Sequence, residues 1–288
     1  MESAGWPIPH IGSVLRRIAG HRPKYFATMD STQGFYQMEV EMTSREFLCF
    51  TTYLGNYVWN RAPMGPKTVP ALFQRAMCVE VFPDLIHKIM EVYIDDFIVW
   101  AQTEDELITR LDQVFTRASE KNLKLNRDPK KCHFGLTEVE YCGHILNESG
   151  TTFSKDRITE VADFAVPENH GELKSFLGMA GYMREHIPHY VKLVHPLQQI
   201  VAHYAKRKRK EAIKWTPELL ETFQRVKTAI QNVYLLHHRY DPASLRLYTD
   251  VSSYGIGAHL CQVVIRADGS NQEQPLGFIS KSLSDTGR

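Results

Sequence analysis

A pair of adjacent acids, Asp95 and Asp96, stands between two apolar segments, and this pattern constrains the fold more than any other. Residues 88–94 and 97–100 predict a strand, a tight turn and a second strand, with the acids at the bend. Acids are common in solvated turns, but flanks as apolar as these predict a largely buried hairpin. Two carboxylates at the tip of a buried hairpin repel each other unless a cation neutralises them. We therefore expect a hard divalent cation with oxygen ligands, Mg²⁺ or Mn²⁺, at this turn.

The composition excludes several classes of protein. Hydrophobic residues make up 43% of the 288 residues, which predicts a packed core rather than disorder. The 34 Lys and Arg against 33 Asp and Glu give a net charge of +1, so total charge does not mark a nucleic-acid binder, although a local basic groove is compatible with it. The five cysteines form no Cys-x-x-Cys pair, which argues against a zinc site or a disulfide framework and favours a reducing compartment. No apolar run approaches the roughly 18–20 residues of a membrane span, and a signal peptide is lacking. We expect a protein that is neither secreted nor bound to a membrane.

A third acid follows another candidate strand. Residues 24–29 read as a strand that delivers Asp30 at its end. Such an acid is usually a turn or capping residue, but sheet-based enzymes also place catalytic groups at strand ends. Farther along, residues 38–42 alternate between apolar and polar side chains, which predicts a half-buried strand.

The second half of the chain has a different pattern. Residues 155–233 read mainly as helix, and strand patterns return at 245–250, 257–265 and 276–283. Within the helical part lies a basic run, Lys206 to Lys210. Such a run is most often a solvated loop and sometimes a contact for nucleic acid or nuclear import.

Seven blocks of the chain, in the correct order, resemble the reverse transcriptases of gypsy-type LTR retrotransposons. Tyr93-Ile94-Asp95-Asp96 resembles their Tyr-X-Asp-Asp signature, and residues 29–37 (Met-Asp-Ser-Thr-Gln-Gly-Phe-Tyr-Gln) resemble their first acidic motif, Leu-Asp-x-x-Ser-Gly-Tyr-x-Gln. The other five blocks are residues 61–74, 131–134, 141–145, 176–197 and 249–258. In the block 61–74, Gly65, Pro70 and Phe73-Gln74 match the family pattern, while the Phe, Leu, Asn and Ala positions of that pattern do not match. In the block 141–145, Cys142 replaces the usual leucine.

The resemblance implies an α+β fold with a right-hand polymerase palm, in which helices pack on an antiparallel sheet. A helical thumb and the first strands of an RNase H-like α/β domain would follow. The implied domains are residues 1–152 for the palm with a remnant of the fingers, 153–236 for the thumb and connection, and 237–288 for an incomplete RNase H-like domain. A three-stranded palm sheet would bring Asp30 beside the acid hairpin.

The implied activity is RNA-directed DNA synthesis, in which a nucleotidyl group passes from a dNTP to a primer 3′-hydroxyl. Two metal ions about 3.5–4 Å apart, Mg²⁺ or Mn²⁺, supply charge neutralisation in such sites. By resemblance, Asp30 and Asp95 would bridge both ions, with Asp96 beside them.

The resemblance assigns further roles to single residues. Lys131 is a candidate proton donor to the pyrophosphate leaving group, although a lysine there is more often a plain surface charge. Phe35 would exclude a 2′-hydroxyl, where a core aromatic is the ordinary alternative. The residues expected near the nucleotide or template are Gln33, Gly34, Phe35, Gly65 and Gln74. The residues expected in the primer grip are Tyr141, Cys142, Gly143 and His144.

The expected partners are a primed RNA or DNA template, dNTPs and the rest of a Pol polyprotein, and a homodimer is compatible with the sequence. The expected location is a cytoplasmic virus-like particle or the nucleus. The family's fingers begin upstream of the first matched segment. Of the several acids that an RNase H site needs, Asp250 is present, and the chain stops at Arg288 before the next one would be expected, so we expect a truncated chain without RNase H activity. The alternatives are a catalytically inactive retroelement remnant that still binds nucleic acid and, more remotely, an unrelated metal-dependent phosphotransferase.

Overall fold

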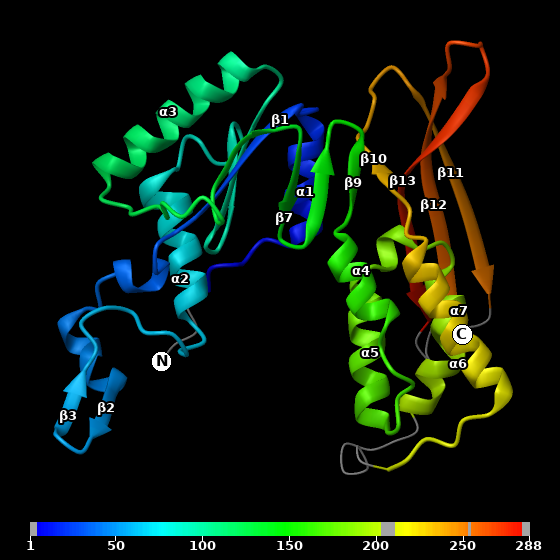
Figure 1. Cartoon of the computed structure of the whole chain (residues 1–288), viewed down its shortest axis with the longest axis horizontal. Helices are drawn as coiled ribbons and strands as arrows, with labels where there is room; N and C mark the ends of the chain where they lie inside the picture. The colour runs from blue at the N-terminus through cyan, green and yellow to red at the C-terminus, as the bar shows by residue number, and fades with distance from the viewer. Residues whose placement is uncertain (1–4, 203–210, 253–254, 284–288) are drawn as a thin grey trace. The chain divides into compact units, whose positions relative to one another are not determined.

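The computed structural model describes most of the chain as helices and antiparallel strands (Figure 1). The described residues are 5–202, 211–252 and 255–283. The chain divides into two compact units, Met1–Cys142 with Leu146–Glu148 and Gly143–Ile145 with Ser149–Arg288. The predicted boundaries near residues 152 and 236 stay a prediction. The basic run Lys206 to Lys210 lies outside the described residues.

The first unit is built on an antiparallel sheet with the strand order β4-β5-β1-β6. The strands are β4 (Met90–Tyr93), β5 (Asp96–Ala101), β1 (Tyr25–Asp30) and β6 (His133–Leu136). The predicted hairpin is β4 and β5, and β1 lies beside it, as expected. The sheet has four strands rather than three, because β6 pairs with the free edge of β1.

Alternate residues of the central strands face two different cores, because side chains in a strand point to opposite faces. Ala27, Met29 and Val99 pack toward α2 (Val69–Ala76) and α3 (Glu104–Glu120). Phe26, Ile98 and Trp100 pack toward α1 (Ile11–Gly20) and the strand β7 (Glu138–Tyr141). Figure 1 shows α3 and α1 on either side of β1. The acid hairpin is therefore covered on both faces.

The remaining elements of this unit are short. They are η1 (Gly34–Gln37), η2 (Met42–Leu48), the hairpin β2 (Cys49–Thr52) and β3 (Gly55–Val58), and one π-helical turn, η3 (Met77–Val81). The predicted strand at 38–42 is wrong. The segment 38–40 pairs with 60–62 only through the bridge between Glu39 and Arg61, because the chain turns into η2 at Met42 before a longer ladder can form.

The second unit begins within the hairpin of β7 and β8 (His144–Asn147). Its helices share one core, centred on Leu173, Phe176 and Val226, which confirms the predicted helical region. The helices are α4 (Lys155–Ala162), α5 (His170–Tyr182), η4 (Arg184–His186), α6 (Tyr190–Ala202) and α7 (Pro217–Gln231). A short pair of strands, β9 (Gly150–Phe153) and β10 (Leu236–His237), lies in the same unit.

The three strands predicted at the end of the chain form, and they make an antiparallel sheet in the order β11-β12-β13. They are β11 (Ser244–Ser252), β12 (Gly255–Ile265) and β13 (Asn271–Ser282). Helices and antiparallel sheets together confirm the α+β class. Among the described residues, no helix is long and apolar enough to cross a membrane.

Candidate active site

Three carboxylates gather at one end of the β4-β5-β1-β6 sheet. Asp30 is the last residue of β1, and it stands directly opposite Asp96, the first residue of β5. Tyr93 is also paired with Asp96, so Ile94 and Asp95 form the two-residue turn between β4 and β5. The pairing of β1 with β5 is therefore what brings the first acidic motif to the acid hairpin.

The turn holds Asp95 through contacts with the segment that follows β1. The Ser31 hydroxyl donates a hydrogen bond to Asp95 Oδ1 at 3.1 Å, and the Ser31 amide donates to the Asp95 carbonyl at 3.3 Å. Gly34 lies against the same carboxylate. A Cβ at Gly34 would overlap Asp95 Oδ1 and Ser31 Oγ, so only glycine leaves space for the acid.

Asp30 is held by a different set of partners. Lys131 Nζ lies 3.0 Å from Asp30 Oδ2, and the Asn126 side chain donates to the same oxygen at 3.2 Å. The Asn126 amide also donates to the Asp30 carbonyl at 2.8 Å. The hydrogen bond to Asp30 raises the pKa of Lys131, so this lysine is a firmly protonated neighbour of the acids.

The electrostatics favour a cation at this end of the sheet. Burial raises the pKa of the Asp95 carboxyl, and the charge of Asp30 adds to that effect against the lowering hydrogen bond from Ser31. Burial also raises the pKa of Asp96, opposed by a hydrogen bond from Cys142 and reinforced by Asp30 and Asp95. Like charges that raise one another's pKa are stabilised by a bound cation.

The carboxylates fit a hard divalent cation in their chemistry, because they offer only oxygen ligands. Within the ranges that the structure describes, however, no three His, Cys, Asp or Glu side chains are arranged to hold a metal ion. Each acid instead has its own partner: Asp30 has Lys131, Asp95 has Ser31 and Asp96 has Cys142. Shared coordination therefore requires at least one carboxylate to exchange its present partner for the ion.

The predicted primer-grip segment is a tight turn between β7 and β8. Cys142 and Gly143 both have positive φ, at 50° and 77°. Tyr141 is buried, and its hydroxyl donates to the Asp96 carbonyl at 3.3 Å. The Cys142 thiol lies 3.7 Å from Asp96 Oδ2, and burial raises the pKa of this thiol strongly. His144 is buried and packs on Phe153, with ring centroids 4.5 Å apart.

The residues expected near the nucleotide divide into two groups. Gln33 is exposed in a left-handed conformation, and Phe35 is half-buried with its ring edge-on to Phe73 at 5.7 Å. Gly65 has a φ of 119° in an open loop, where no atom lies within 4 Å of an added Cβ. These positions are compatible with a substrate contact, which stays a prediction.

Gln74 does not have the exposed side chain that a contact with the substrate would require. Its side chain is only 2% exposed, and its amide is bonded to the backbone of the acid hairpin. It donates to the Val92 carbonyl at 2.9 Å and accepts from the Ile94 amide at 2.8 Å. The side chain points into the hairpin because the first unit's core places α2 against β4 and β5.

Comparisons with known proteins place this geometry in a family. The model of the family "Reverse transcriptase (RNA-dependent DNA polymerase)" matches residues 8–146, and that of the "RNase H-like domain found in reverse transcriptase" matches residues 215–288. The Pol polyprotein of the Drosophila melanogaster transposon opus is 32% identical over 286 residues, and that of transposon 297 is 30% identical over 280 residues. The chain belongs to the reverse transcriptases of gypsy-type retrotransposon Pol polyproteins.

This reverse transcriptase chain spans only part of its relatives. The matches cover 98% and 97% of the chain, but only 28% of the opus polyprotein and 25% of the 297 polyprotein. The fold is that of a foamy viral protease-reverse transcriptase solved in complex with double-stranded DNA. That structure superimposes with a TM-score of 0.83 at 22% identity and covers 99% of this chain and 47% of its own. The four-stranded sheet of the first unit is thus the polymerase palm.

The reverse transcriptase palm also contains features that the sequence did not predict. Ser31 and Asn126 contact the acids. Ser31 directly follows the predicted Asp30 in the sequence, whereas Asn126 is far from all three acids along the chain. Within β4 of the hairpin, Glu91 is 1% exposed and is bonded to Arg17 Nε at 2.6 Å and to His87 Nδ1 at 2.8 Å. Arg17 lies on α1, so the buried acid is neutralised by a residue that is far away in the sequence and adjacent in the fold.

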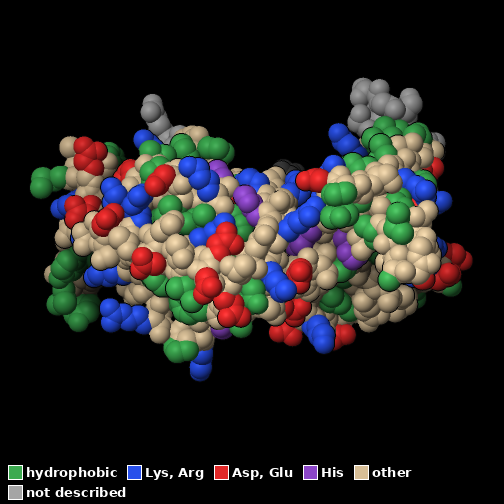
Figure 2. All heavy atoms as spheres, turned by 90° about the horizontal axis from the view of Figure 1, so that it is seen from above, with side chains coloured by type: hydrophobic (Ala, Val, Ile, Leu, Met, Phe, Trp, Pro, Cys, Tyr) green, Lys and Arg blue, Asp and Glu red, His purple; other side chains and the backbone are tan. Residues whose placement is uncertain are grey.

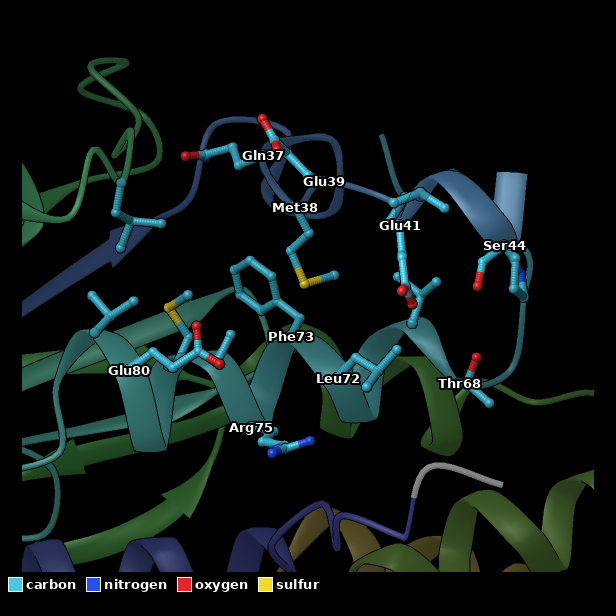
Figure 3. A pocket seen from close by; sticks show the side chains of 18 of the residues that line it. Gln37, Met38, Glu39, Glu41, Ser44, Thr68, Leu72, Phe73, Arg75 and Glu80 are labelled. Carbon is cyan, nitrogen blue, oxygen red and sulfur yellow. The ribbon is translucent and has the colours of Figure 1, made fainter. Parts of the chain in front are cut away.

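A cavity of about 560 Å³ lies between α2 and the segment from Gln37 to Glu41. In Figure 3, Phe73 points from α2 toward Met38 across this cavity. Phe73 therefore lines the cavity and also packs against Phe35.

Over the surface seen in Figure 2, Lys and Arg side chains are interspersed with Asp and Glu, in keeping with the small net charge.

The RNase H-like part contains the predicted Asp250. It lies on β11 opposite Gly257, and its side chain is 63% exposed. His189 Nδ1 lies 3.9 Å from its Oδ2. A role of Asp250 in RNA cleavage stays a prediction.

Proposed function

We propose that this chain contains the polymerase centre of an RNA-directed DNA polymerase, which transfers a nucleotidyl group from a dNTP to a primer 3′-hydroxyl. The observation that supports this most strongly is the register of β1 and β5. It pairs Asp30 with Asp96 and places Asp95 in the adjoining turn. Three acids from two distant motifs thus meet where templated nucleotidyl transfer needs its charge neutralised.

Asp30, Asp95 and Asp96 would hold two Mg²⁺ or Mn²⁺ ions. When bound, such ions neutralise phosphate charge and make the attacking hydroxyl more acidic. The chain's own contribution is to hold the carboxylates. Ser31 fixes Asp95, Tyr141 fixes the backbone of Asp96, and Lys131 and Asn126 fix Asp30.

The proposed substrates are dNTPs and a primed RNA or DNA template. Related foamy viral structures were solved with double-stranded DNA and with an RNA/DNA hybrid, which supports this substrate class. Phe35, braced by Phe73, would lie under the sugar and exclude a 2′-hydroxyl. Lys131 would meet the triphosphate, and its ammonium would donate a proton to the leaving pyrophosphate once it exchanges its ion pair with Asp30 for the phosphate.

The second candidate is a remnant that binds nucleic acid without turnover. It is favoured by the separate partners of the three acids and by the ion pair that Lys131 makes with Asp30. If these contacts persist in solution, the site cannot assemble. This candidate predicts duplex binding that does not depend on the acids.

Primer extension on poly(rA)/oligo(dT) with Mg²⁺ or Mn²⁺ tests the proposal. The matched variants are Asp95→Asn and Asp112→Asn, since Asp112 is an exposed acid on α3. We expect extension by the parent chain and Asp112→Asn and none by Asp95→Asn. Duplex binding without extension in all three would favour the remnant. Neither binding nor extension would refute both candidates.

A further inference from the structure

Gln74 is the only contact from α2 to the backbone of the acid turn among the hydrogen bonds that the structure describes. Its amide nitrogen donates to the Val92 carbonyl at 2.9 Å, and its amide oxygen accepts from the Ile94 amide at 2.8 Å. The bonds bridge the end of β4 and the first residue of the turn. A buried amide with both ends paired holds its partners firmly, because breaking either bond leaves an unsatisfied polar group.

The residue that Gln74 holds is in a strained conformation. Ile94 has a φ of 55°, in the left-handed region. A two-residue hairpin turn with positive φ at this position normally has glycine there, because a β-branched side chain is strained in that region. Without an external contact, Ile94 would relax toward negative φ and would turn the following residue, Asp95, away from Ser31.

The neighbour of Gln74 contacts the opposite side of the site. Phe73 packs against Phe35, the residue expected under the nucleotide sugar, and it points toward Met38 in Figure 3. Two consecutive residues of α2 thus contact the expected nucleotide pocket and the acid turn. A direct substrate contact by Gln74 does not fit, since the side chain is buried and both amide ends are engaged.

We propose that Gln74 is a positioning residue, which keeps Ile94 in its left-handed conformation so that the Asp95 carboxylate stays at the metal-binding end of the sheet. The role rests on the proposed polymerase function, because it acts through Asp95. Gln74 does not touch the substrate. Its removal therefore lowers the rate of the chemical step and weakens metal binding, with little effect on dNTP affinity.

The test compares Gln74→Met, Gln74→Met with Ile94→Gly, and Gln113→Met in the 288-residue chain. Gln113 is an exposed glutamine on α3, so it controls for the substitution itself. Three quantities are measured: kcat and KM for a dNTP, the Mn²⁺ affinity by electron paramagnetic resonance, and hydrogen exchange of the Ile94 amide. The last two do not depend on turnover.

For Gln74→Met we expect kcat to fall roughly tenfold or more, the size of effect that one or two unsatisfied buried groups produce. KM should change less than about threefold, because uniform substrate binding is untouched. Mn²⁺ should bind more weakly, and the Ile94 amide should exchange faster. Ile94→Gly should restore part of the lost kcat and Mn²⁺ affinity, since glycine adopts positive φ without strain. This rescue is not expected if Gln74 only packs in the core.

Several outcomes would overturn the proposal. One is a raised KM at unchanged kcat, which would mean that Gln74 binds the nucleotide. Another is a slowly exchanging Ile94 amide in Gln74→Met, or no rescue by Ile94→Gly. If the parent chain shows no extension, the proposed function fails instead, and Mn²⁺ binding with amide exchange still decides the role of Gln74. If Gln74→Met does not fold, Gln74→Glu, which keeps an acceptor for the Ile94 amide and loses the donor to the Val92 carbonyl, should keep slow exchange of the Ile94 amide and Mn²⁺ binding close to that of the parent chain; fast exchange in this variant would overturn the proposal.

Discussion

Asp30 and Asp96 face each other across β1 and β5, and each is the terminal residue of its strand at that end of the sheet. Burial raises the pKa of both Asp95 and Asp96, and the nearby charge of Asp30 raises it further. The close carboxylates thus destabilise the fold in the absence of a cation and favour cation binding, and functional sites commonly reduce stability in this way.

Asp95→Asn should stabilise the fold at neutral pH while abolishing extension. A carboxyl whose pKa is higher in the folded than in the unfolded chain binds more protons when folded. Its contribution to stability therefore falls as pH rises from about 3.9, the ordinary Asp value, through the raised pKa. We expect Tm at pH 7 to rise by about 2 °C or more, with the difference shrinking toward pH 4. An equal difference at both pH values would contradict this account.

Divalent cations should stabilise the parent chain and not its Asp95→Asn variant. A ligand that binds only the folded state raises Tm in proportion to its occupancy. Thermal unfolding with Mn²⁺ should show a rise in Tm for the parent chain and for Asp112→Asn. The same rise in all three proteins would mean that the ions bind elsewhere.

Arg17→Met should destabilise the palm, because Glu91 is 1% exposed and, among the ion pairs of the described residues, would keep a buried charge with His87 as its remaining partner. Removing one partner of a buried pair costs about 3–5 kcal/mol, and the partial exposure of Arg17 favours the lower end. Urea unfolding measures this loss. Glu91→Leu added to Arg17→Met should recover most of it, and Arg16→Met, at an exposed neighbouring position, should have little effect. Failure of the double variant to recover would show that Arg17 acts through packing alone.

Gly34→Ala should lower primer extension by about 100-fold, the effect that a 1 Å misplacement of a catalytic group can have. The new Cβ would overlap Asp95 Oδ1 and Ser31 Oγ, so the carboxylate must move. The matched control is Gly178→Ala on α5, where nothing lies within 4 Å of an added Cβ. Comparable activity of the two variants would show that Asp95 tolerates displacement.

Phe35→Val should admit ribonucleotides. A smaller side chain leaves room for a 2′-hydroxyl, and loss of a steric barrier of this kind changes discrimination by roughly 10- to 100-fold. Incorporation of rATP against dATP measures it, with Phe115→Val on the exposed side of α3 as the control. Unchanged selectivity in Phe35→Val would assign Phe35 to the core, together with Phe73.

The sequence by itself determined the local architecture of the site. The apolar flanks of Asp95 and Asp96 predicted the buried hairpin, and the strand ending at Asp30 formed as expected. These features depend on periodicity and turn chemistry, which are contained within a few neighbouring residues. The alternation at 38–42 had the same local signal, but it formed only a single bridge to the segment 60–62, because η2 begins at Met42 and ends the pairing.

Only the tertiary structure decided which side chains hold the acids in place. Asn126 bonds to Asp30, Arg17 on α1 bonds to Glu91, and Gln74 on α2 bonds to Ile94. The sequence cannot indicate such pairs, because their residues meet only after the sheet has formed and its helices have packed on it. Motif order identified the family and its acids. The geometry that positions those acids arises from long-range packing.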